Sequence, residues 1–491
     1  MELRRLLAAV FSVVALWALL GAGVRSTYGA RVTADEPQYL LSAISLVEDG
    51  DLDIADELAA ERWRDFHEAQ LPRQTEPRPD GSELSPHDPL LPALLAPGVA
   101  VAQVVAGDRQ HAELAGARVV LALVAGALAA VMVRTAVVCL GVRRSTAVVV
   151  VGAFSLAAPL STYGNQLYPE LVSALSVAVC AAALLELAAA GEHRRWGPSL
   201  LWTGAVVALP WLGVKYAGVA AATALLGLVL DRRHRVVALV GLAVAGVAYL
   251  VVHQRVYGGW TVYAAGDHFV GGELTVVGNA PDHLGRTVRL AGLLVDRHFG
   301  LLVWAPAFVL AVPAVGALLR RRDRTAAVLL APLAAGWATA TWIALTMHGW
   351  WWPGRQVVVV LPLAVLAVAA FVDGERRAGA RWVWPAIVIS GIVGVTTWTW
   401  LAVEATFGDL RLIVDFDRTT NPWVRAARLA LPDLREAGST TDLVLSAWTV
   451  VLLDLGAWGW RRGGSGTRGT PQECASQPGS DSASAPSPAV E

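Results

Sequence analysis

Twelve apolar runs, most of them close to the length of a membrane span, constrain what this chain can fold into. A helix needs about 20 mostly apolar residues to cross the hydrocarbon core of a bilayer. Hydrophobic residues make up 55% of the chain and charged residues only 16%, which leaves too little polar surface for a soluble protein of 491 residues. The sequence therefore predicts an all-α polytopic membrane protein with about 12 transmembrane helices. The runs are 5–24, 115–139, 146–162, 170–190, 199–213, 216–230, 236–253, 300–318, 325–346, 356–372, 383–402 and 443–460.

The positions of arginine orient these spans, because basic side chains gather in the cytoplasmic loops of membrane proteins. The apolar stretch 88–106 holds Pro89, Pro92 and Pro97, which disfavour a helix, and we interpret it as an interfacial or re-entrant segment. The arginine clusters then fall on one side of the membrane, so that both termini are cytoplasmic and the longest outer loop is 25–114. These clusters are Arg4/Arg5, Arg143/Arg144, Arg194/Arg195, Arg232/Arg233/Arg235, Arg320/Arg321/Arg322/Arg324, Arg376/Arg377/Arg381 and Arg461/Arg462.

Charge and cysteine content further limit the classes of protein to which this chain can belong. The net charge of −1 gives no electrostatic reason to expect nucleic acid as a partner. The three cysteines have no disulfide or zinc spacing. We interpret residues 1–24 as a first span rather than a signal peptide, since the later spans need an anchor. The segment 463–491, rich in Gly, Ser, Pro and Ala without periodicity, is expected to be a disordered cytoplasmic tail.

The longest outer loop opens with two adjacent acids, Asp35 and Glu36. Pro37 favours the start of a helix, and the apolar pattern after it predicts a short amphipathic helix on the membrane surface, stopped by Gly50. One interpretation is that the acids only cap this helix. A single acid suffices for a cap, however, and the outer membrane surface is where a lipid-borne substrate presents its headgroup. We therefore expect a substrate site here.

The stretch DEPQY, with Asp35, Glu36 and Tyr39, resembles the start of the GT-C superfamily of integral membrane glycosyltransferases. The resemblance is to its protein O-mannosyltransferase and aminoarabinose transferase branch, which is similar to glycosyltransferase family 39. It covers residues 1–373 and is weak from 374 onward. Further motifs follow in matching order, namely SPHDPLLPALLAPG with His87, AGARVVLAL with Arg118, NQLYPEL with Glu170, DRHFGLLVWAP with Arg297 and His298, and WWWPGRQ with Arg355.

The resemblance implies a GT-C-like catalytic module over 1–373, followed by C-terminal helices with an outer loop over 374–462. It implies a sugar donor on polyprenyl phosphate and no nucleotide, which agrees with the lack of a Gly-rich phosphate loop. The acid after the first span is the general base in that family. Asp35 would accordingly take the proton of the acceptor hydroxyl, and the sugar would transfer in one step with inversion. The resemblance assigns substrate contacts to Glu36, Tyr39 and Glu170.

A departing lipid phosphate needs positive charge. Lys215 is the only lysine of the chain and lies at the predicted outer surface. It is a candidate for the phosphate contact, with a snorkelling side chain at a helix end as the alternative. Arg118 and Arg355 are further candidates, and an interior salt bridge is the alternative for Arg118. His87, beside Asp88, is a further candidate for the substrate site, where it would orient the base or bind a metal. The alternative is that it only closes a loop.

An acidic pair and a tryptophan cluster are interpreted as structural features without a role in catalysis. Asp51 and Asp53 have the spacing of an Asp-x-Asp metal pair, but their surroundings are polar, and we interpret them as a solvated loop. A divalent metal is thus compatible with the resemblance but has no support in the sequence, and we expect no cofactor. The tryptophans 350–352 are interpreted as an interfacial belt, with sugar stacking as the alternative.

The leading hypothesis is a transferase at the outer face of a bacterial plasma membrane, with a glycan, a glycolipid or a protein as acceptor. A transporter or lipid flippase is the second hypothesis, and it predicts ionisable residues near the bilayer midplane. The candidate residues gather instead at one face of the membrane. A non-catalytic cell-envelope assembly protein with the same fold is the third hypothesis.

Overall fold

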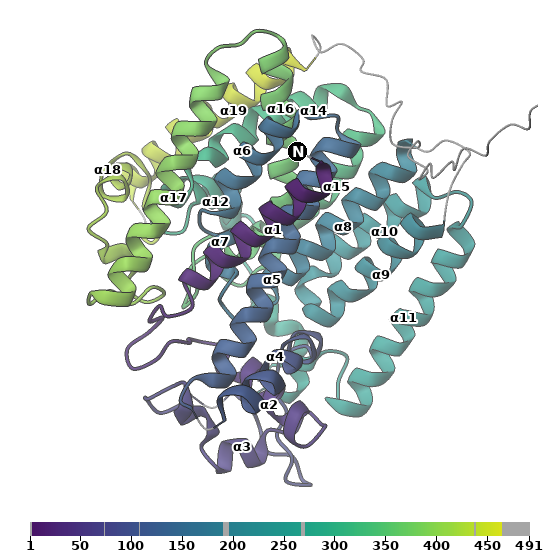
Figure 1. The fold of residues 1–491 in the computed structure, drawn as a ribbon, viewed down its shortest axis with the longest axis vertical. Helices are drawn as coiled ribbons and strands as arrows, with labels where there is room; N and C mark the ends of the chain where they lie inside the picture. The colour runs from purple at the N-terminus through teal and green to yellow at the C-terminus, as the bar shows by residue number, and fades with distance from the viewer. Residues whose placement is uncertain are drawn as a thin grey trace, which may run out of the picture.

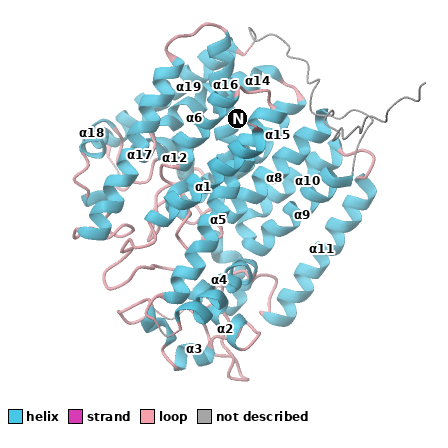
Figure 2. Ribbon diagram, viewed as in Figure 1, coloured by secondary structure: helices cyan, strands magenta, loops and turns pink. Residues whose placement is uncertain are grey.

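The computed structural model describes residues 2–72, 74–107, 109–189, 196–266, 271–436 and 438–463. Within these ranges the regular structure is helical, and extended segments pair only as isolated bridges. Figure 2 shows helices joined by loops across the molecule. The predicted all-α class is confirmed. The tail predicted over 463–491 lies outside the described ranges, apart from its first residue.

Eight helices of the described part are long and apolar enough to cross a membrane. The four other predicted runs form shorter helical segments, so each of the predicted runs contains helix. The eight spans are α1 (Leu3–Leu20), α5 (Ala112–Arg134) with its π-helical extension Thr135–Cys139, α8 (Glu170–Ala189), α11 (Arg235–Val256), α15 (Arg324–Ala338) extended to Ile343, α16 (Leu361–Arg377) preceded by the 3₁₀ turn η9 (Arg355–Val360), α17 (Val383–Phe407) and α19 (Ser439–Arg462).

The shorter segments carry helix breakers or turns. The run 300–318 is divided into α13 (Leu301–Trp304), a 3₁₀ turn (Pro306–Leu310) and α14 (Ala311–Arg321), because proline cannot donate the hydrogen bond that would continue α13. The others are α6 (Arg144–Ser155) with α7 (Leu160–Tyr163), α9 (Trp196–Leu212), and η3 (Val214–Tyr216) leading into α10 (Ala217–Leu230).

The spans differ in how much protein surrounds them. In the most apolar 18 residues of the span formed by η9 and α16, 89% are buried within the protein. The corresponding share is 11% in α19 and 17% in both α1 and α11. Figure 1 shows α11 at one edge of the bundle. A helix that is apolar all round is stable at a protein edge only if lipid covers it, so these peripheral helices fit a membrane environment.

Helix α19 docks on α14 through glycines. A Cβ atom added at Gly316 would lie 2.1 Å from the carbonyl oxygen of Gly456, and one added at Gly459 would lie 2.1 Å from the carbonyl oxygen of Pro313. The two backbones are therefore in direct contact, as at other small-residue interfaces between membrane helices. This contact holds an otherwise exposed helix onto the bundle.

The long loop after α1 folds into a unit of its own at the end of the bundle (Figure 1). It contains α2 (Glu36–Glu48), α3 (Ala55–Ala59), the 3₁₀ turn η1 (Arg62–Asp65) and α4 (Leu90–Ala106). Helix α4 packs against both α2 and α5. It continues through Pro97, so the expectation that prolines disfavour a helix over 88–106 is wrong. Its position relative to a bilayer stays a prediction.

The interpretation of α2 as a surface helix is also corrected. Its boundaries match the prediction, and Gly50 follows it with a positive φ of +79°. However, the polar residues Gln38, Ser42 and Ser45 are as buried as the apolar ones on the other side of the helix. The packing of α4 and α5 against α2 leaves only its last turn exposed. Polar residues at helical spacing predict a water-facing side, but here they are enclosed by protein, and Ser45 donates to the turn at Asp51 and Asp53.

Candidate functional site

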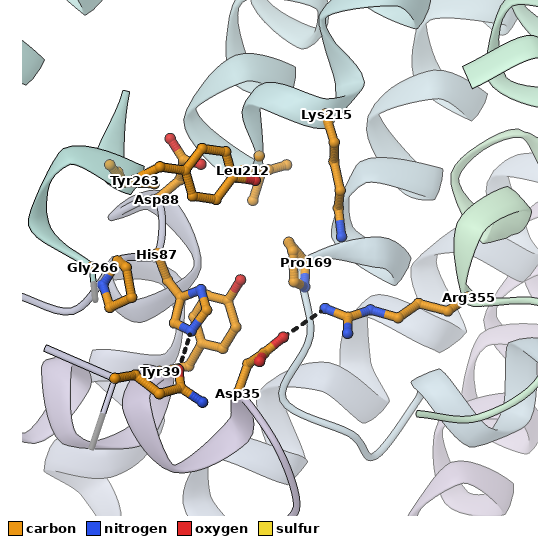
Figure 3. A pocket seen from close by; sticks show the side chains of 14 residues that line it. Asp35, Tyr39, His87, Asp88, Pro169, Leu212, Lys215, Tyr263, Gly266 and Arg355 are labelled. Atoms are coloured by element: carbon orange, nitrogen blue, oxygen red, sulfur yellow. Dashed lines mark hydrogen bonds and ion pairs between the residues drawn. The ribbon is translucent and has the colours of Figure 1, made fainter. Parts of the chain in front are cut away.

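A pocket of about 190 Å³ opens where the long loop meets the ends of the spans. Figure 3 shows Lys215 and Arg355 on one side of Asp35, and His87 and Tyr39 on the other side. The pocket is mixed in character, with charged groups beside proline, leucine and tyrosine. Its lining consists of Asp35, Tyr39, Gln74, Pro86, His87, Asp88, Pro169, Leu212, Gly213, Lys215, Val262, Tyr263, Gly266 and Arg355.

The charged residues of the site all lie at helix ends. Asp35 precedes α2, Glu170 begins α8, Lys215 lies in the turn η3, and Arg355 begins η9. Gly354 has a φ of +83°, and a Cβ there would lie 2.7 Å from Leu301, so glycine is required for the turn that presents Arg355. The loop ends thus converge although they are far apart in the sequence.

Four charges alternate across the site. Arg355 Nη2 donates to Asp35 Oδ2 at 2.9 Å, and Arg355 Nε donates to Glu170 Oε1 at 2.8 Å. Lys215 Nζ lies 2.6 Å from the same Glu170 oxygen. The side chains of Asp35 and Lys215 remain 25% and 32% exposed, whereas that of Glu170 is 1% exposed. The two acids and the two bases balance in charge, and Asp35 and Lys215 are the more exposed members.

Asp35 is not simply a helix cap. It occupies the N-cap position of α2, but its side chain makes no capping hydrogen bond. The preceding residue, Ala34, has a left-handed φ of +50°, which is uncommon for a residue with a side chain. Burial would raise the pKa of the Asp35 carboxyl, but the charge and hydrogen bond of Arg355, together with the nearby His87 and Lys215, outweigh burial and hold the pKa below its usual value. The carboxylate therefore faces the pocket in its charged form.

The opposite side of the pocket combines an aromatic stack with a buried acid. His87 stacks on Tyr39 with ring centroids 4.5 Å apart, and its Nε2 lies 3.2 Å from the Gln74 amide oxygen. Asp88 lies 3.4 Å from His253 Nε2. Burial raises the pKa of Asp88, and the neighbouring His253 opposes that rise. This side offers a flat ring surface with polar edges, a type of surface suited to a sugar.

No family model and no curated protein sequence matches the chain. Its fold is similar to that of ArnT from Cupriavidus metallidurans bound to undecaprenyl phosphate, with a TM-score of 0.54 and 16% identity over 93% of this chain and 75% of that chain. The apo structure of the same ArnT aligns with a TM-score of 0.50 and 17% identity, over 93% of this chain and 77% of that chain.

The chain has a GT-C fold. This confirms the resemblance at the level of fold, over more of the chain than the motifs covered. At 16–17% sequence identity the similarity shows only the fold. The roles of single residues therefore depend on the geometry of the pocket. Within the GT-C fold, the residues predicted for the site divide into two groups.

One group meets at the pocket. Asp35, Tyr39, His87, Lys215 and Arg355 all line it, and Glu170 joins it through ion pairs with both cations. These residues were selected from short motifs at the predicted ends of spans. The structure thus brings together residues that the sequence could only place on the same face of the membrane.

Glu36 and Arg118 lie elsewhere. Glu36 is fully buried and accepts hydrogen bonds of 2.9 Å from the backbone N–H groups of Thr33 and Leu167. Burial raises its pKa to about 7. Arg118 is buried as well and donates to the carbonyl oxygens of Ala22 and Arg31. Neither residue lines the pocket, and both join backbone segments behind it.

Some pocket residues were not predicted. Asp88 was noted only as the neighbour of His87, and its place between prolines was the available signal. Gln74 and Tyr263 come from loops without a recognisable pattern.

The tryptophan cluster divides as well. Trp350 is exposed, as expected at a membrane interface, but Trp352 is fully buried and packs edge-on against Trp304 and Trp398. The interpretation of all three tryptophans as an interfacial belt is therefore wrong for Trp352.

Proposed function

We propose that this protein is an inverting glycosyltransferase that takes its sugar from a polyprenyl phosphate, with Asp35 as the general base. One observation carries the proposal, namely that an accessible carboxylate and two cations meet in one pocket. Transfer from a lipid phosphate needs a base for the acceptor hydroxyl and positive charge for the departing phosphate. The ArnT structure with a similar fold contains undecaprenyl phosphate, which belongs to this class of carrier.

The bond changes of the reaction balance with one base. The acceptor hydroxyl gives its proton to Asp35, and its oxygen forms a bond to the anomeric carbon of the sugar. The bond from that carbon to the phosphate oxygen breaks, and the phosphate leaves with the electron pair. Because the phosphate departs as an anion, it needs no second acid. Attack opposite to the leaving group inverts the anomeric centre.

Lys215 and Arg355 are the proposed partners of the phosphate. Lys215 is the more accessible of the two and presents a compact charge to the pocket. A bound phosphate competes with Asp35 for the guanidinium of Arg355. When Arg355 turns towards the phosphate, the interaction that lowers the pKa of Asp35 weakens, and the carboxylate becomes a stronger base. Donor binding and activation of the base are coupled in this way.

The remaining residues are assigned by their place in the pocket. Tyr39 and His87 form the ring surface for the acceptor or for the sugar, and Glu170 holds the two cations in place before the donor binds. The arginine distribution supports a site on the outer face of the plasma membrane. The acceptor there is a glycan, a glycolipid or a protein.

A transfer assay tests the proposal. Purified protein in lipid vesicles is supplied with radiolabelled polyprenyl-phosphate mannose or arabinose together with cell-envelope acceptors, and wild type is compared with Asp35→Asn. We expect label transfer by wild type and a loss of about 10²–10⁴ in rate in the variant. Glu48→Gln, at the far end of α2, is the control that keeps transfer. Equal transfer by wild type and Asp35→Asn would contradict the role of Asp35, and no transfer from any lipid-linked sugar would contradict the enzyme class.

A further inference from the structure

The turn between α2 and α3 concentrates acidic residues at the end of α2 that lies away from Asp35. Two of them use one carboxylate oxygen each to accept hydrogen bonds. Asp51 Oδ1 accepts hydrogen bonds of 3.0 Å from Ser45 Oγ and from the Asp53 N–H. Asp53 Oδ1 accepts from the N–H groups of Ala55 and Glu83, at 3.1 Å and 2.8 Å. The Asp-x-Asp pair therefore stabilises the turn through these hydrogen bonds.

Three other acids of the same turn converge. One carboxylate oxygen from each of Asp49, Asp56 and Glu57 lies within 4.8 Å of the other two. Asp49 and Asp56 are exposed, whereas Glu57 is 2% exposed. Like charges at this separation repel one another, so the arrangement is costly unless a cation or a proton balances it.

Glu57 is the buried member of this cluster. Both of its carboxylate oxygens are buried, and within the described residues neither accepts a hydrogen bond from a residue outside the cluster. Burial of a carboxylate without a partner is costly.

Arg62, the basic residue closest to this turn in the sequence, forms its ion pairs with other acids. Arg62 forms ion pairs of 2.6 Å with Glu48 and of 2.8 Å with Glu113. Its hydrogen bonds therefore connect α2 to the start of α5. The three converging carboxylates are left without a direct ion pair to it.

We propose that Asp49, Asp56 and Glu57 bind a divalent metal cation, with Ca²⁺ as the favoured ion. The donors are all carboxylate oxygens, which suit hard cations, and the cluster has no His or Cys to favour zinc. Calcium ligands at about 2.3–2.6 Å allow two oxygens to lie up to roughly 5 Å apart, in agreement with the observed spacing. The bound ion joins the last turn of α2 to α3. It is a structural site, beyond the proposed transfer reaction.

Calcium binding is measured directly on the full-length protein, without any activity readout. Protein in detergent is first dialysed against EGTA, then titrated with CaCl₂ or MgCl₂ by calorimetry, and its thermal unfolding is followed by tryptophan fluorescence. We expect saturable binding of one Ca²⁺ and a rise in Tm that EGTA reverses. Glu57→Gln keeps the shape of the side chain and removes its charge. We expect it to weaken Ca²⁺ binding by at least about tenfold, the minimum typical of residues supporting a metal site.

Asp56→Asn serves as a second ligand variant, in case Glu57→Gln unfolds. Glu61→Gln is the matched control, because Glu61 lies in the same loop but pairs with Arg64. We expect the control to bind Ca²⁺ like wild type. The proposal is overturned if wild type shows no saturable binding, or if the ligand variants bind as tightly as the control. A Glu57→Gln variant more stable than wild type at every Ca²⁺ concentration would also overturn it, since Glu57 would then hold a proton and not a metal.

Discussion

Arg355 Nη2 lies 2.9 Å from Asp35 Oδ2, although the two residues are 320 positions apart in the sequence. The same guanidinium donates through Nε to Glu170. A planar fork can serve two carboxylates at once, whereas an ammonium group is a compact point charge. The distance between the two acids of the site therefore depends on one arginine.

Replacement of Arg355 by alanine should cost stability and remove transfer. We expect a loss of about 3 kcal/mol in the free energy of unfolding, at the lower end for a broken buried ion pair, because Lys215 still neutralises Glu170. Denaturant unfolding in detergent measures the loss. Arg355→Lys should recover part of the stability but little transfer. An Arg355→Ala variant as stable as wild type would show that the two ion pairs do not hold the site together.

Lys215 should govern donor binding. Loss of a charged hydrogen bond to the phosphate costs about 1.5–3 kcal/mol, so Lys215→Gln should raise the KM for the lipid-linked donor by roughly 10- to 100-fold. Donor titration in the transfer assay measures the effect, and Lys215→Arg should restore part of it. An unchanged KM for the donor in Lys215→Gln would remove this lysine from the phosphate site.

The burial of Glu36 should appear as a pH dependence of stability. Its pKa is raised from 4.5 to about 7 in the folded protein. Between these values the folded state binds the proton more tightly than the unfolded state, so stability falls as pH rises, by up to roughly 3 kcal/mol. Thermal unfolding between pH of about 5 and about 8 should show this slope in wild type and a flatter profile in Glu36→Gln. Parallel profiles would mean that Glu36 does not titrate in this range.

The glycine contact between α14 and α19 should tolerate no larger side chain. Gly316→Val places two methyl groups where the backbone of α19 lies, and overpacking of this kind costs about 1–3 kcal/mol. We expect a lower Tm and faster proteolysis before α19. Gly246→Val is the control, because a Cβ at Gly246 meets no atom within 4 Å. Equal Tm values for the two variants would contradict the close approach.

Much of the fold was predictable because membrane spans are a strong signal. A membrane-spanning helix needs only sufficient length and apolar residues, and both properties can be read from the sequence. Interruptions within spans were harder to predict. The division of the run 300–318 at Pro306 follows from a known rule. The continuation of α4 through Pro97 depends on packing against α2 and α5, which the sequence does not show.

The site was predictable to the level of motifs and not of contacts. Asp35 and Glu36 are adjacent acids that the sequence alone does not distinguish. Asp35 faces the pocket, whereas Glu36 accepts hydrogen bonds from the backbone of Thr33 and Leu167. A helix start turns successive side chains by about 100°, so neighbours in the sequence point in different directions. Which of the two reaches Arg355 is decided by the tertiary structure.

The pairing of early acids with a late arginine also sets an order of assembly. Ribosomal synthesis makes Asp35 and Glu170 long before Arg355, so a partly inserted chain carries these acids with only Lys215 to balance them. The cluster of Asp35, Glu170, Lys215 and Arg355 reaches charge neutrality only when the turn before α16, the most enclosed span, is in place. A chain truncated before that turn should therefore keep its acids hydrated and leave the bundle open, which marks it for quality-control proteases of the membrane.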